Sequence, residues 1–433
     1  MKSGVQAVFL LSAVAIVCVL LAVGLGGSQA TSASADDESQ PSAVADDGVC
    51  LDCHSNAGKL ISLLRERAEP EAEEESGGCA VAPGRSEFLN YFVKKEFATS
   101  THGQLGCSAC HGGDTATDDI DAIHADMRSA GTQCAVCHGE IAETHETSIH
   151  WTLAGQDEAL RMRAGTEENF AQLEPVRQND CNTCHATCGD CHVNIPQAVG
   201  GGLISGHEFY GTPPMEDTCA VCHGSRAGGE FLGTLSEDLP ADVHFQAGMT
   251  CLDCHKEPMH GDDSQYDSRW EVDGLPGCTD CHEAVPNSSA ASHGIPAHDD
   301  VSCQVCHAVS YKNCSGCHSN IDESGEYHRA PQETELVFKI GHNTVPGYPY
   351  EYVTVRHNPV ARDAFAFFGE NLLPDFDQYP NWKTAAPHNI QRSTPQNETC
   401  ESCHGNEALF LMEGDLDPAD SRANEAVIVE KMP

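Results

Sequence analysis

The hydrophobic positions of the chain gather into one long apolar run and a few short amphipathic stretches, with polar segments between them. The long run is Val5–Leu25, which is apolar apart from Gln6 and Ser12 and is long enough to span a bilayer. Residues 28–30 (SQA) resemble the small-residue site at which signal peptides are cleaved. Residues 1–30 are therefore predicted to be a targeting segment, either a cleaved signal peptide or, as we favour, an N-terminal membrane anchor.

The remaining helical patterns are short. Apolar residues at helical spacing predict helices at Leu60–Arg67, at Ser86–Ala98, over 156–163 and over 167–173. Residues 31–48 are small and acidic, typical of a flexible tether, and 69–78 is a second acidic stretch, typical of a solvated linker. The linkers elsewhere are rich in Gly, Asp and Pro. The pattern predicts a mainly α fold with much irregular structure and little sheet.

Composition adds two constraints. The chain has 433 residues with 39 Gly, 22 Pro and only 6% aromatic residues, so we expect few conventional hydrophobic cores. The formal net charge is −43, which disfavours nucleic acid as a partner because a polyanion binds basic surfaces. Such acidity keeps a protein soluble and is also used by halophiles, so a saline source and a merely solvated surface both remain open.

One motif changes this picture. The sequence Cys-x-x-Cys-His occurs eleven times and uses 22 of the 24 cysteines, whereas chance predicts about 0.07 occurrences. In chain order, units 1 to 11 are Cys50, Cys53, His54; Cys107, Cys110, His111; Cys134, Cys137, His138; Cys181, Cys184, His185; Cys188, Cys191, His192; Cys219, Cys222, His223; Cys251, Cys254, His255; Cys278, Cys281, His282; Cys303, Cys306, His307; Cys314, Cys317, His318; and Cys400, Cys403, His404.

The motif is the attachment signature of c-type haem: the two thiols form thioethers and the adjacent His supplies a proximal ligand to iron. Zinc ribbons also use Cys-x-x-Cys, but they do not need His at the fifth position every time. We therefore expect about eleven covalent haem c groups. Units 4 and 5 begin seven residues apart, so the chain can separate them by roughly 25 Å at most. Two haems this close favour electron hopping.

A second His for each iron is available. Thirteen histidines lie outside the units, against eleven irons. We expect most to be distal ligands, with His145 and His328 the weakest candidates. The favoured set is His102, His124, His150, His207, His244, His260, His293, His298, His342, His357 and His388. Of these, His102, His244 and His298 lie just before units 2, 7 and 9, too close to fold back on the haem that follows, and are expected to bind a neighbouring iron.

The spacing of the units suggests five regions after one another in the chain. They are the targeting segment 1–30, the tether 31–48, a first unit with linker and short helix at 49–106, a dense core of nine units at 107–318, and a haem-poor clasp segment with unit 11 and an acidic tail at 319–433. Cys79 stands outside every unit. A small buried hydrophobe, a redox-labile thiol and a sulfur ligand to iron all remain open for it.

The string of units, with CNTCHATCGDCHV and the later CHAVSYKNCSGCH, resembles the multihaem cytochrome c superfamily, most of all the octahaem tetrathionate-reductase-type and doubled Cys-x-x-Cys-His proteins. The resemblance covers roughly Cys107–His318 and implies electron carriers, extracellular cytochrome filaments or reductases of nitrogen and sulfur compounds. No unit ends in Lys, which departs from the nitrite-reductase pattern.

We expect an exported multihaem cytochrome that transfers electrons in anaerobic or extracellular respiration. Its partners would be a quinol-oxidising membrane complex or other redox proteins, at the outer face of the cytoplasmic membrane, in the periplasm or outside the cell. Two alternatives remain: a reductase of a small sulfur or nitrogen compound with one open haem, and a subunit of a polymeric cytochrome filament. No catalytic residue is assigned.

Overall fold

The structure is a computed structural model that describes residues 47–67, 87–128, 130–179, 181–184, 186–196, 199–256, 259–261, 275–286, 288, 292–314, 319–321, 327–329, 334–358 and 360–432. The predicted targeting segment, residues 31–46 of the tether, the linker 69–78, Cys79, His185, Cys317 and His318 lie outside these residues. No helix within them is long and apolar enough to cross a membrane.

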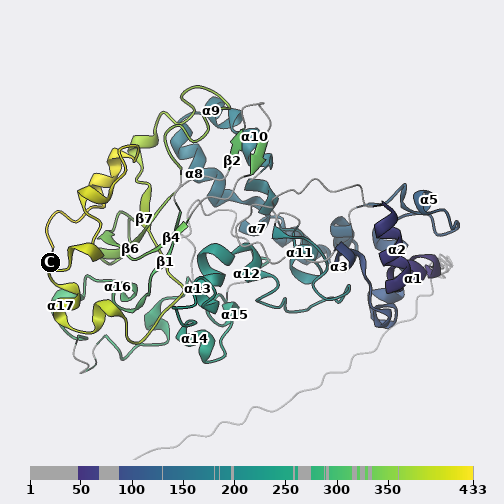
Figure 1. The fold of residues 1–433 in the computed structure, drawn as a ribbon, viewed down its shortest axis with the longest axis horizontal. Coiled ribbons are helices and arrows are strands. Elements are labelled where there is room, and N and C mark those ends of the chain that lie inside the picture. The colour runs from purple at the N-terminus through teal and green to yellow at the C-terminus, as the bar shows by residue number, and fades with distance from the viewer. Residues whose placement is uncertain are drawn as a thin grey trace, which may run out of the picture. The chain divides into compact units, whose positions relative to one another are not determined.

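The structure is 44% helical and 8% strand, which confirms the expectation of a mainly helical chain with little sheet. The α-helices are short (Figure 1): α1 Gly48–His54, α2 Ala57–Arg67, α3 Glu87–Tyr91, α4 Cys107–His111, α5 Ile120–His124, α6 Gly139–His145, α7 Ile149–Thr152, α8 Ala154–Ala164, α9 Glu167–Gln172, α10 Glu174–Asn179, α11 Cys188–His192, α12 Cys219–Cys222, α13 Gly229–Leu232, α14 Val243–Gln246, α15 Cys251–Cys254, α16 Cys303–His307 and α17 Cys400–Cys403.

Tighter turns fill several gaps between them. They are η1 Lys95–Thr99, η2 Gly103–Leu105, η3 Ala130–Val136, η4 Cys181–Cys184, the π-helical turn η6 Gly224–Gly228, η8 Cys278–Asp280, η9 Pro296–His298, η10 Phe376–Gln378, η11 Pro395–Asn397, η12 Glu407–Leu409, η13 Glu413–Asp415 and η14 Arg422–Ala426.

Most Cys-x-x-Cys-His units form one helical turn, which places the two cysteines three residues apart on the same face. Local sequence encodes several of these turns. The Asp253 carboxylate of unit 7 accepts from both the backbone N–H and the hydroxyl of Thr250, closing a capping box at the start of α15. Asp190 and Thr187 do the same for unit 5 at α11.

The amphipathic stretches form helices where the spacing predicts them, with one exception. The predicted helices at Leu60–Arg67, 156–163 and 167–173 correspond to α2, α8 and α9. Within Ser86–Ala98, the α-helix α3 ends at Tyr91, and helical structure resumes only as the 3₁₀ turn η1 at Lys95. The next backbone groups bind other segments instead: Val93 N–H donates to His54 O (2.8 Å) and Lys94 N–H to Gly206 O (3.0 Å). Tertiary hydrogen bonds thus outcompete helical ones.

The strands lie in and beside the haem-poor segment. A three-stranded antiparallel sheet has the order β5 (Ile340–His342), β6 (Tyr352–His357), β7 (Trp382–Thr384), and β6 and β7 are labelled side by side in Figure 1. Two antiparallel pairs join β1 (Tyr311–Cys314) to β4 (Thr334–Val337) and β2 (Ser319–Ile321) to β3 (Tyr327–Arg329).

The expectation of few conventional cores is wrong for part of the chain. One core joins α8, α9 and α10 to the segment around η10 through Leu160, Leu173, Val176, Leu373 and Phe376. Two others join the three-stranded sheet and residues next to units 9 and 11 to the chain's end through Val353, Val355, Ile340, Phe410, Leu411, Val427 and Val429. The last segment, expected to be an acidic tail, is therefore anchored by buried apolar side chains.

Candidate functional site

Each unit histidine that the structure describes lies opposite one histidine from outside the units. The nine ring-centre separations run from 5.8 to 6.4 Å. The pairs are His54–His124 (6.2 Å), His111–His207 (5.8 Å), His138–His102 (6.3 Å), His192–His260 (5.9 Å), His223–His150 (6.4 Å), His255–His388 (6.4 Å), His282–His244 (6.1 Å), His307–His293 (6.0 Å) and His404–His298 (6.1 Å).

This spacing fits a metal ion between two imidazoles. A metal–imidazole nitrogen bond is about 2.0 Å long and the ring centre lies about 1.1 Å behind the nitrogen, so two rings sharing one metal are about 6.2 Å apart. Two of these same histidines also pack directly on phenylalanine at shorter distances, 4.1 Å between the ring centres of His102 and Phe209 and 4.5 Å between those of His207 and Phe97. The near-constant separation over the nine described pairs leaves room for a metal ion in each, and His260 lies 5.9 Å from His145 as well as from His192.

The second nitrogen of many of these rings is held by the protein. Seven paired histidines have a defined Nδ1 partner, which orients the ring and leaves Nε2 for the opposite side. The partners are Tyr91 O for His54 (2.8 Å), Ile120 O for His124 (2.7 Å), Tyr210 O for His192 (2.5 Å), Asp242 Oδ1 for His244 (3.0 Å), Ser288 Oγ for His293 (3.3 Å), Ser292 O for His298 (3.2 Å) and Gln391 O for His307 (3.0 Å).

The histidines just upstream of a unit do not pair with that unit. His102 precedes unit 2 and pairs with unit 3, and His244 precedes unit 7 and pairs with unit 8. His298 precedes unit 9 and pairs with unit 11. His388, in the haem-poor segment, pairs with unit 7. The segments are therefore interleaved, with each pair joining separate parts of the chain.

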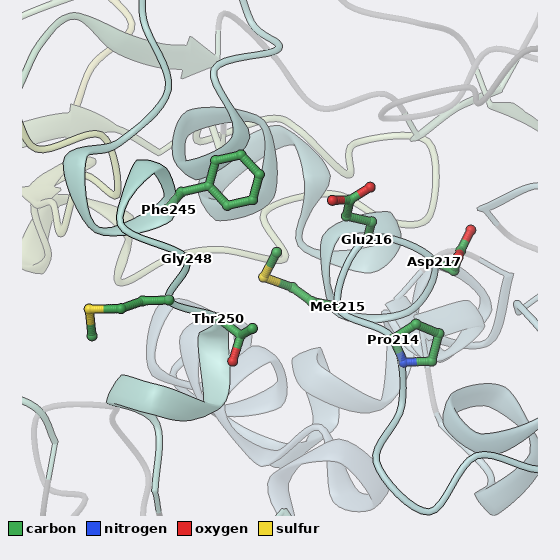
Figure 2. Close-up of a pocket in the computed structure, with 8 residues that line it drawn as sticks. Pro214, Met215, Glu216, Asp217, Phe245, Gly248 and Thr250 are labelled. Carbon is green, nitrogen blue, oxygen red and sulfur yellow. The ribbon is translucent and has the colours of Figure 1, made fainter.

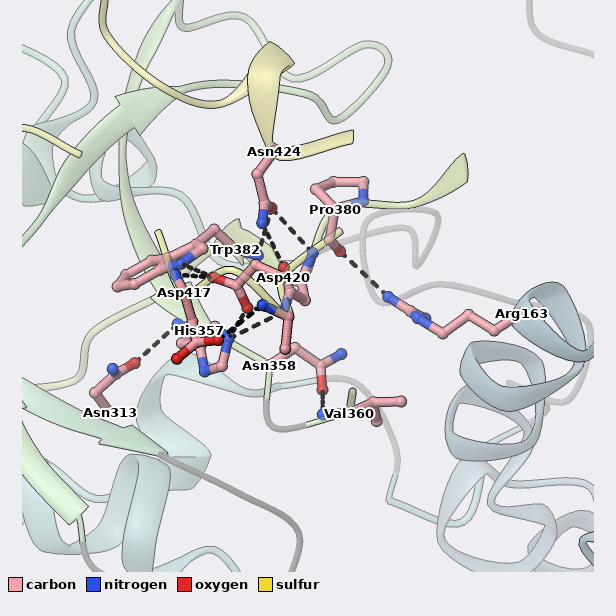
Figure 3. Close-up of polar contacts among 12 residues, drawn as sticks. Arg163, Asn313, His357, Asn358, Val360, Pro380, Trp382, Asp417, Asp420 and Asn424 are labelled. Carbon is pink, nitrogen blue, oxygen red and sulfur yellow. Dashed lines mark hydrogen bonds and ion pairs between the residues drawn. The ribbon is translucent and has the colours of Figure 1, made fainter. Parts of the chain in front are cut away.

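His357 is placed differently from the prediction. Its Nε2–H donates to Asp420 Oδ1 (2.8 Å), and Asn381 Nδ2 lies 3.0 Å from the same nitrogen (Figure 3). Trp382 Nε1–H also donates to Asp420, at 3.3 Å. The nitrogen that would bind iron is thus occupied within the protein. In this arrangement His357 ties the chain's end to β6, and its assignment as a distal ligand stays a prediction that these contacts disfavour.

Three other histidines remain outside the pairs. His145 is buried with Nε2 donating to Ala186 O (3.0 Å) and Nδ1 near Ser148 Oγ (3.3 Å), so both ring nitrogens have protein partners. His342 lies 4.9 Å from the Tyr352 ring, with Nδ1 3.7 Å from a Glu351 oxygen, and stays a prediction. His328 belongs to β3. Because His185 and His318 lie outside the described residues, the distal partners of units 4 and 10 are not assigned.

Thiols of neighbouring units meet. The thiols of Cys50 and Cys107 lie close together beside Asp47, and electrostatic interactions join Cys134 to Cys188, Cys219 to Cys251 and Cys278 to Cys303. Electrostatic contact joins Cys110 to Cys134, Cys191 to Cys219, Cys254 to Cys281 and Cys306 to Cys403. Together these contacts arrange the described units in the order 1, 2, 3, 5, 6, 7, 8, 9, 11. Groups attached to the thiols would follow one another in the same order.

Burial keeps several paired imidazoles neutral. Desolvation lowers the pKa of His207 to about 4, assisted by the nearby His111, and it also lowers the pKa of His223 and His255. A neutral imidazole is the form that binds metal. His207 also has φ of +71°, a left-handed conformation that few non-glycine residues adopt and that the surrounding contacts must hold.

Several apolar side chains in and beside the units are exposed on the surface of the polypeptide. Val136, inside unit 3, is 78% exposed, and Leu252 lies exposed inside unit 7. Leu275, Val285 and Ile295 are exposed next to units 8 and 9. These side chains would gain from a covering group that removes them from water. A porphyrin attached to the adjacent thiols fits this requirement.

Zinc fits less well. Within the described residues, the one group of three His, Cys, Asp or Glu ligand atoms lying within 4.8 Å of one another joins Asp47, Cys50 and Cys107. It mixes two different units and contains no histidine. A structural zinc site would instead bring the two thiols and the imidazole of one unit together. The described units pair each imidazole with a second imidazole.

A cavity of about 340 Å³ lies between the segments that lead into units 6 and 7 (Figure 2). Pro214, Met215 and Glu216 line it from one side, and Phe245 and Met249 belong to the segment before unit 7. Its mainly apolar wall adjoins two units whose thiols, Cys219 and Cys251, interact electrostatically. It therefore belongs to the same candidate site.

Two buried carboxylates near the pairs escaped the sequence reasoning. Glu230 accepts from the His388 backbone N–H (2.7 Å) and forms a buried ion pair with Arg356. Asp242 contacts His244 and also Ile390. Asp242 precedes His244 by two residues, a weak signal that the sequence does carry. Nothing local marks Glu230, because its partners come from distant strands.

The chain matches no known protein-family model, and no curated protein or solved structure is detectably similar to it.

Proposed function

We propose that this chain is a multihaem c-type cytochrome that carries electrons, with haem c attached at the eleven Cys-x-x-Cys-His units. The observation that carries the proposal is the opposition of all nine described unit histidines to a second histidine at 5.8–6.4 Å. Bound haem supplies one-electron chemistry at iron.

The chain's own residues have three roles in this proposal. The thiols fix the cofactors, and their contacts set the order in which the units follow one another. The paired imidazoles would hold the iron at each described unit and would leave no position there for an exchangeable ligand. Carbonyl, hydroxyl and carboxylate oxygens hold Nδ1 and tune the basicity of each imidazole. An array with closed axial positions favours a carrier over an enzyme.

The proposed setting is outside the cytoplasm, at the membrane surface, in the periplasm or beyond. The apolar run Val5–Leu25 supports export, and covalent haem attachment of this type takes place on exported chains. The partners are other redox proteins, with a quinol-oxidising membrane complex as the electron donor. The acidic surface implied by the net charge of −43 favours partners with basic docking faces.

Two measurements on the purified full-length protein test the proposal. The intact mass should exceed the apoprotein mass by eleven haem equivalents. The fully reduced protein should bind no carbon monoxide if units 4 and 10 each have a second histidine, as the nine described units do. A haem-free, zinc-loaded product from a host competent in cytochrome c maturation would overturn the cofactor assignment. One equivalent of bound carbon monoxide, with turnover of tetrathionate or hydroxylamine, would establish the reductase alternative.

A further inference from the structure

Asp242 occupies a special position among the residues that hold the paired histidines. Of the seven paired histidines with a defined Nδ1 partner, His244 alone faces a carboxylate; the other six face carbonyl or hydroxyl oxygens. The distance from His244 Nδ1 to Asp242 Oδ1 is 3.0 Å. The Asp242 side chain is only 2% exposed, so solvent screens this contact little.

The hydrogen bonds of Asp242 fix the position and orientation of its carboxylate. Oδ1 also accepts from the backbone N–H groups of His244 (2.6 Å) and Phe245 (3.3 Å), at the start of α14. Oδ2 accepts from the Ile390 N–H (2.6 Å). Three of these partners are backbone N–H groups, and the fourth is His244 Nδ1, which donates in the tautomer that leaves Nε2 free. Together the four contacts hold the side chain in a single orientation.

The same contacts place Asp242 between units 7 and 8. His244 pairs with His282 of unit 8, and Ile390 follows closely on His388, which pairs with His255 of unit 7. The segment around Asp242 is further joined to that stretch by Asn389, whose side-chain N–H donates to Pro240 O (2.7 Å), and by Gln391, which donates to Ala241 O (2.8 Å). The carboxylate therefore lies where the segment before His244 meets the segment that follows His388, and the hydrogen bonds between these two segments hold it in place.

A carboxylate at Nδ1 makes an imidazole a more basic, more strongly donating metal ligand. A stronger donor stabilises the oxidised iron, and hydrogen bonding around the ligands is one of the levers that set haem potentials. We propose that Asp242 is a positioning residue that lowers the reduction potential of the iron held by His244 and His282 at unit 8. The inference rests on the proposed function, since it requires haem at that unit.

The consequence concerns the path of electrons. Unit 8 stands between units 7 and 9 in the order set by the thiol contacts. At unit 9, both paired histidines face neutral oxygens, Gln391 O for His307 and Ser288 Oγ for His293. The iron at unit 8 therefore has a lower reduction potential than the iron at unit 9, and electron transfer from unit 9 to unit 8 is energetically uphill. The array is divided there into two groups of units that exchange electrons across the step.

The test is a redox titration of full-length holoprotein, followed optically and by electron paramagnetic resonance of the ferric low-spin irons. In D242N, reduction of one iron should become about tenfold more favourable, a rise of about 59 mV for a one-electron couple. The g values of that one iron should move as its distal imidazole loses anionic character. The other potentials should stay in place, and the haem content should remain eleven.

Two matched variants separate this effect from general ones. D190N removes a carboxylate that caps the helix of unit 5 and bonds Thr187 rather than an imidazole, so it should shift every potential less than D242N does. S288A removes the neutral Nδ1 partner of His293 and should also have a smaller effect. An equal shift in D190N would reduce the role of Asp242 to bulk charge and overturn the inference.

A further variant covers the case in which D242N fails to load its haems. H244M replaces the proposed ligand itself. It should change the potential and the electron paramagnetic resonance signal of the iron that has the lowered potential. If the signal of a different iron changes, the assignment to unit 8 is wrong. Unchanged potentials in fully loaded D242N would defeat the inference and leave the carrier function standing. A protein without haem at its units would instead defeat the proposed function.

Discussion

Residues 47–145 and residues 338–432 bury their apolar side chains very differently. In the first region, the described residues contain only Leu60 and Ile123 as buried hydrophobes, although three units lie there. In the second region, which holds one unit, aliphatic and aromatic side chains from the sheet, η10 and the chain's end are buried in the cores described above.

The difference shows two ways of stabilising one chain. The C-terminal region buries its own apolar surface, the usual driving force of folding. The N-terminal region has short helices and exposed hydrophobes such as Val136, and its long-range contacts include histidine pairs whose rings are too far apart to touch. On the proposed function, the cofactor supplies the missing interior, so folding and haem attachment are coupled there.

The largest expected effect comes from omitting the cofactor. When the chain is produced without haem attachment, residues 47–145 should lose their amide hydrogen-exchange protection, because almost no apolar core remains. The core around Phe376 should retain measurable protection, since it needs no cofactor. The holoprotein, protected in both regions, is the control. Equal protection of both regions in the haem-free chain would contradict the comparison.

The next effect probes the conventional core. Phe376 is 0% exposed within it, so F376A should cost about 3–5 kcal/mol of unfolding free energy. F367A is the matched control, because Phe367 is 63% exposed and should change stability by about 0.5 kcal/mol or less. Denaturant titration followed by tryptophan fluorescence measures both, with haem content checked. A large loss of haem in F376A would show that the two regions do not fold independently.

A smaller effect is expected at Asp420. Burial opposes its ionisation, but hydrogen bonds from His357 and Asn381 outweigh it and hold the pKa of the carboxyl below its ordinary value. A depressed folded-state pKa contributes stability at neutral pH that is lost as the pH falls below about 4. D420N should therefore cost about 1–3 kcal/mol at neutral pH and flatten the acid limb of the stability curve. If the unfolding free energy of D420N fell at low pH in the same way as that of the unmodified protein, other carboxyls would control this loss of stability.

The same variant tests whether His357 binds an iron or only Asp420. Haem spectra of D420N should match those of the unmodified protein, because the His357 network holds the chain's end and not an iron. A change in the spin state of any iron would restore His357 as a ligand.

The smallest expected effect on stability comes from replacing a single histidine ligand. This effect is also the most specific, because each replacement should alter one iron. H102M should change the spin state or potential of one iron, that of unit 3, and leave ten unchanged. H145Q is the control: His145 bonds Ala186 and Ser148 through its ring, so its replacement should leave the iron spectra unaltered. Resonance Raman and redox titration measure both. If H145Q altered the spectrum of one iron and H102M altered none, His145 rather than His102 would be the distal ligand.

Local sequence was sufficient for the features that depend on neighbouring residues. The helical turns of the units follow from their caps, as at Thr250 and Asp253, and α2, α8 and α9 follow from apolar spacing. The excess of histidines outside the units indicated distal partners, and the short distance from His102 to Cys107 indicated that it binds elsewhere. Ser86–Ala98 escaped this reasoning because hydrogen bonds to His54 and Gly206 end its helix.

By itself, the sequence determined the number of Cys-x-x-Cys-His units, the residues that form them and the mainly helical character of the chain, because all of these are local properties. Only the tertiary structure decided which histidine faces which unit, that His357 binds Asp420, and that Asp242 reaches His244 and Ile390 together. It also decided where conventional cores form. These features join segments far apart in the chain, and they depend on packing and ring orientation, which neither composition nor spacing encodes.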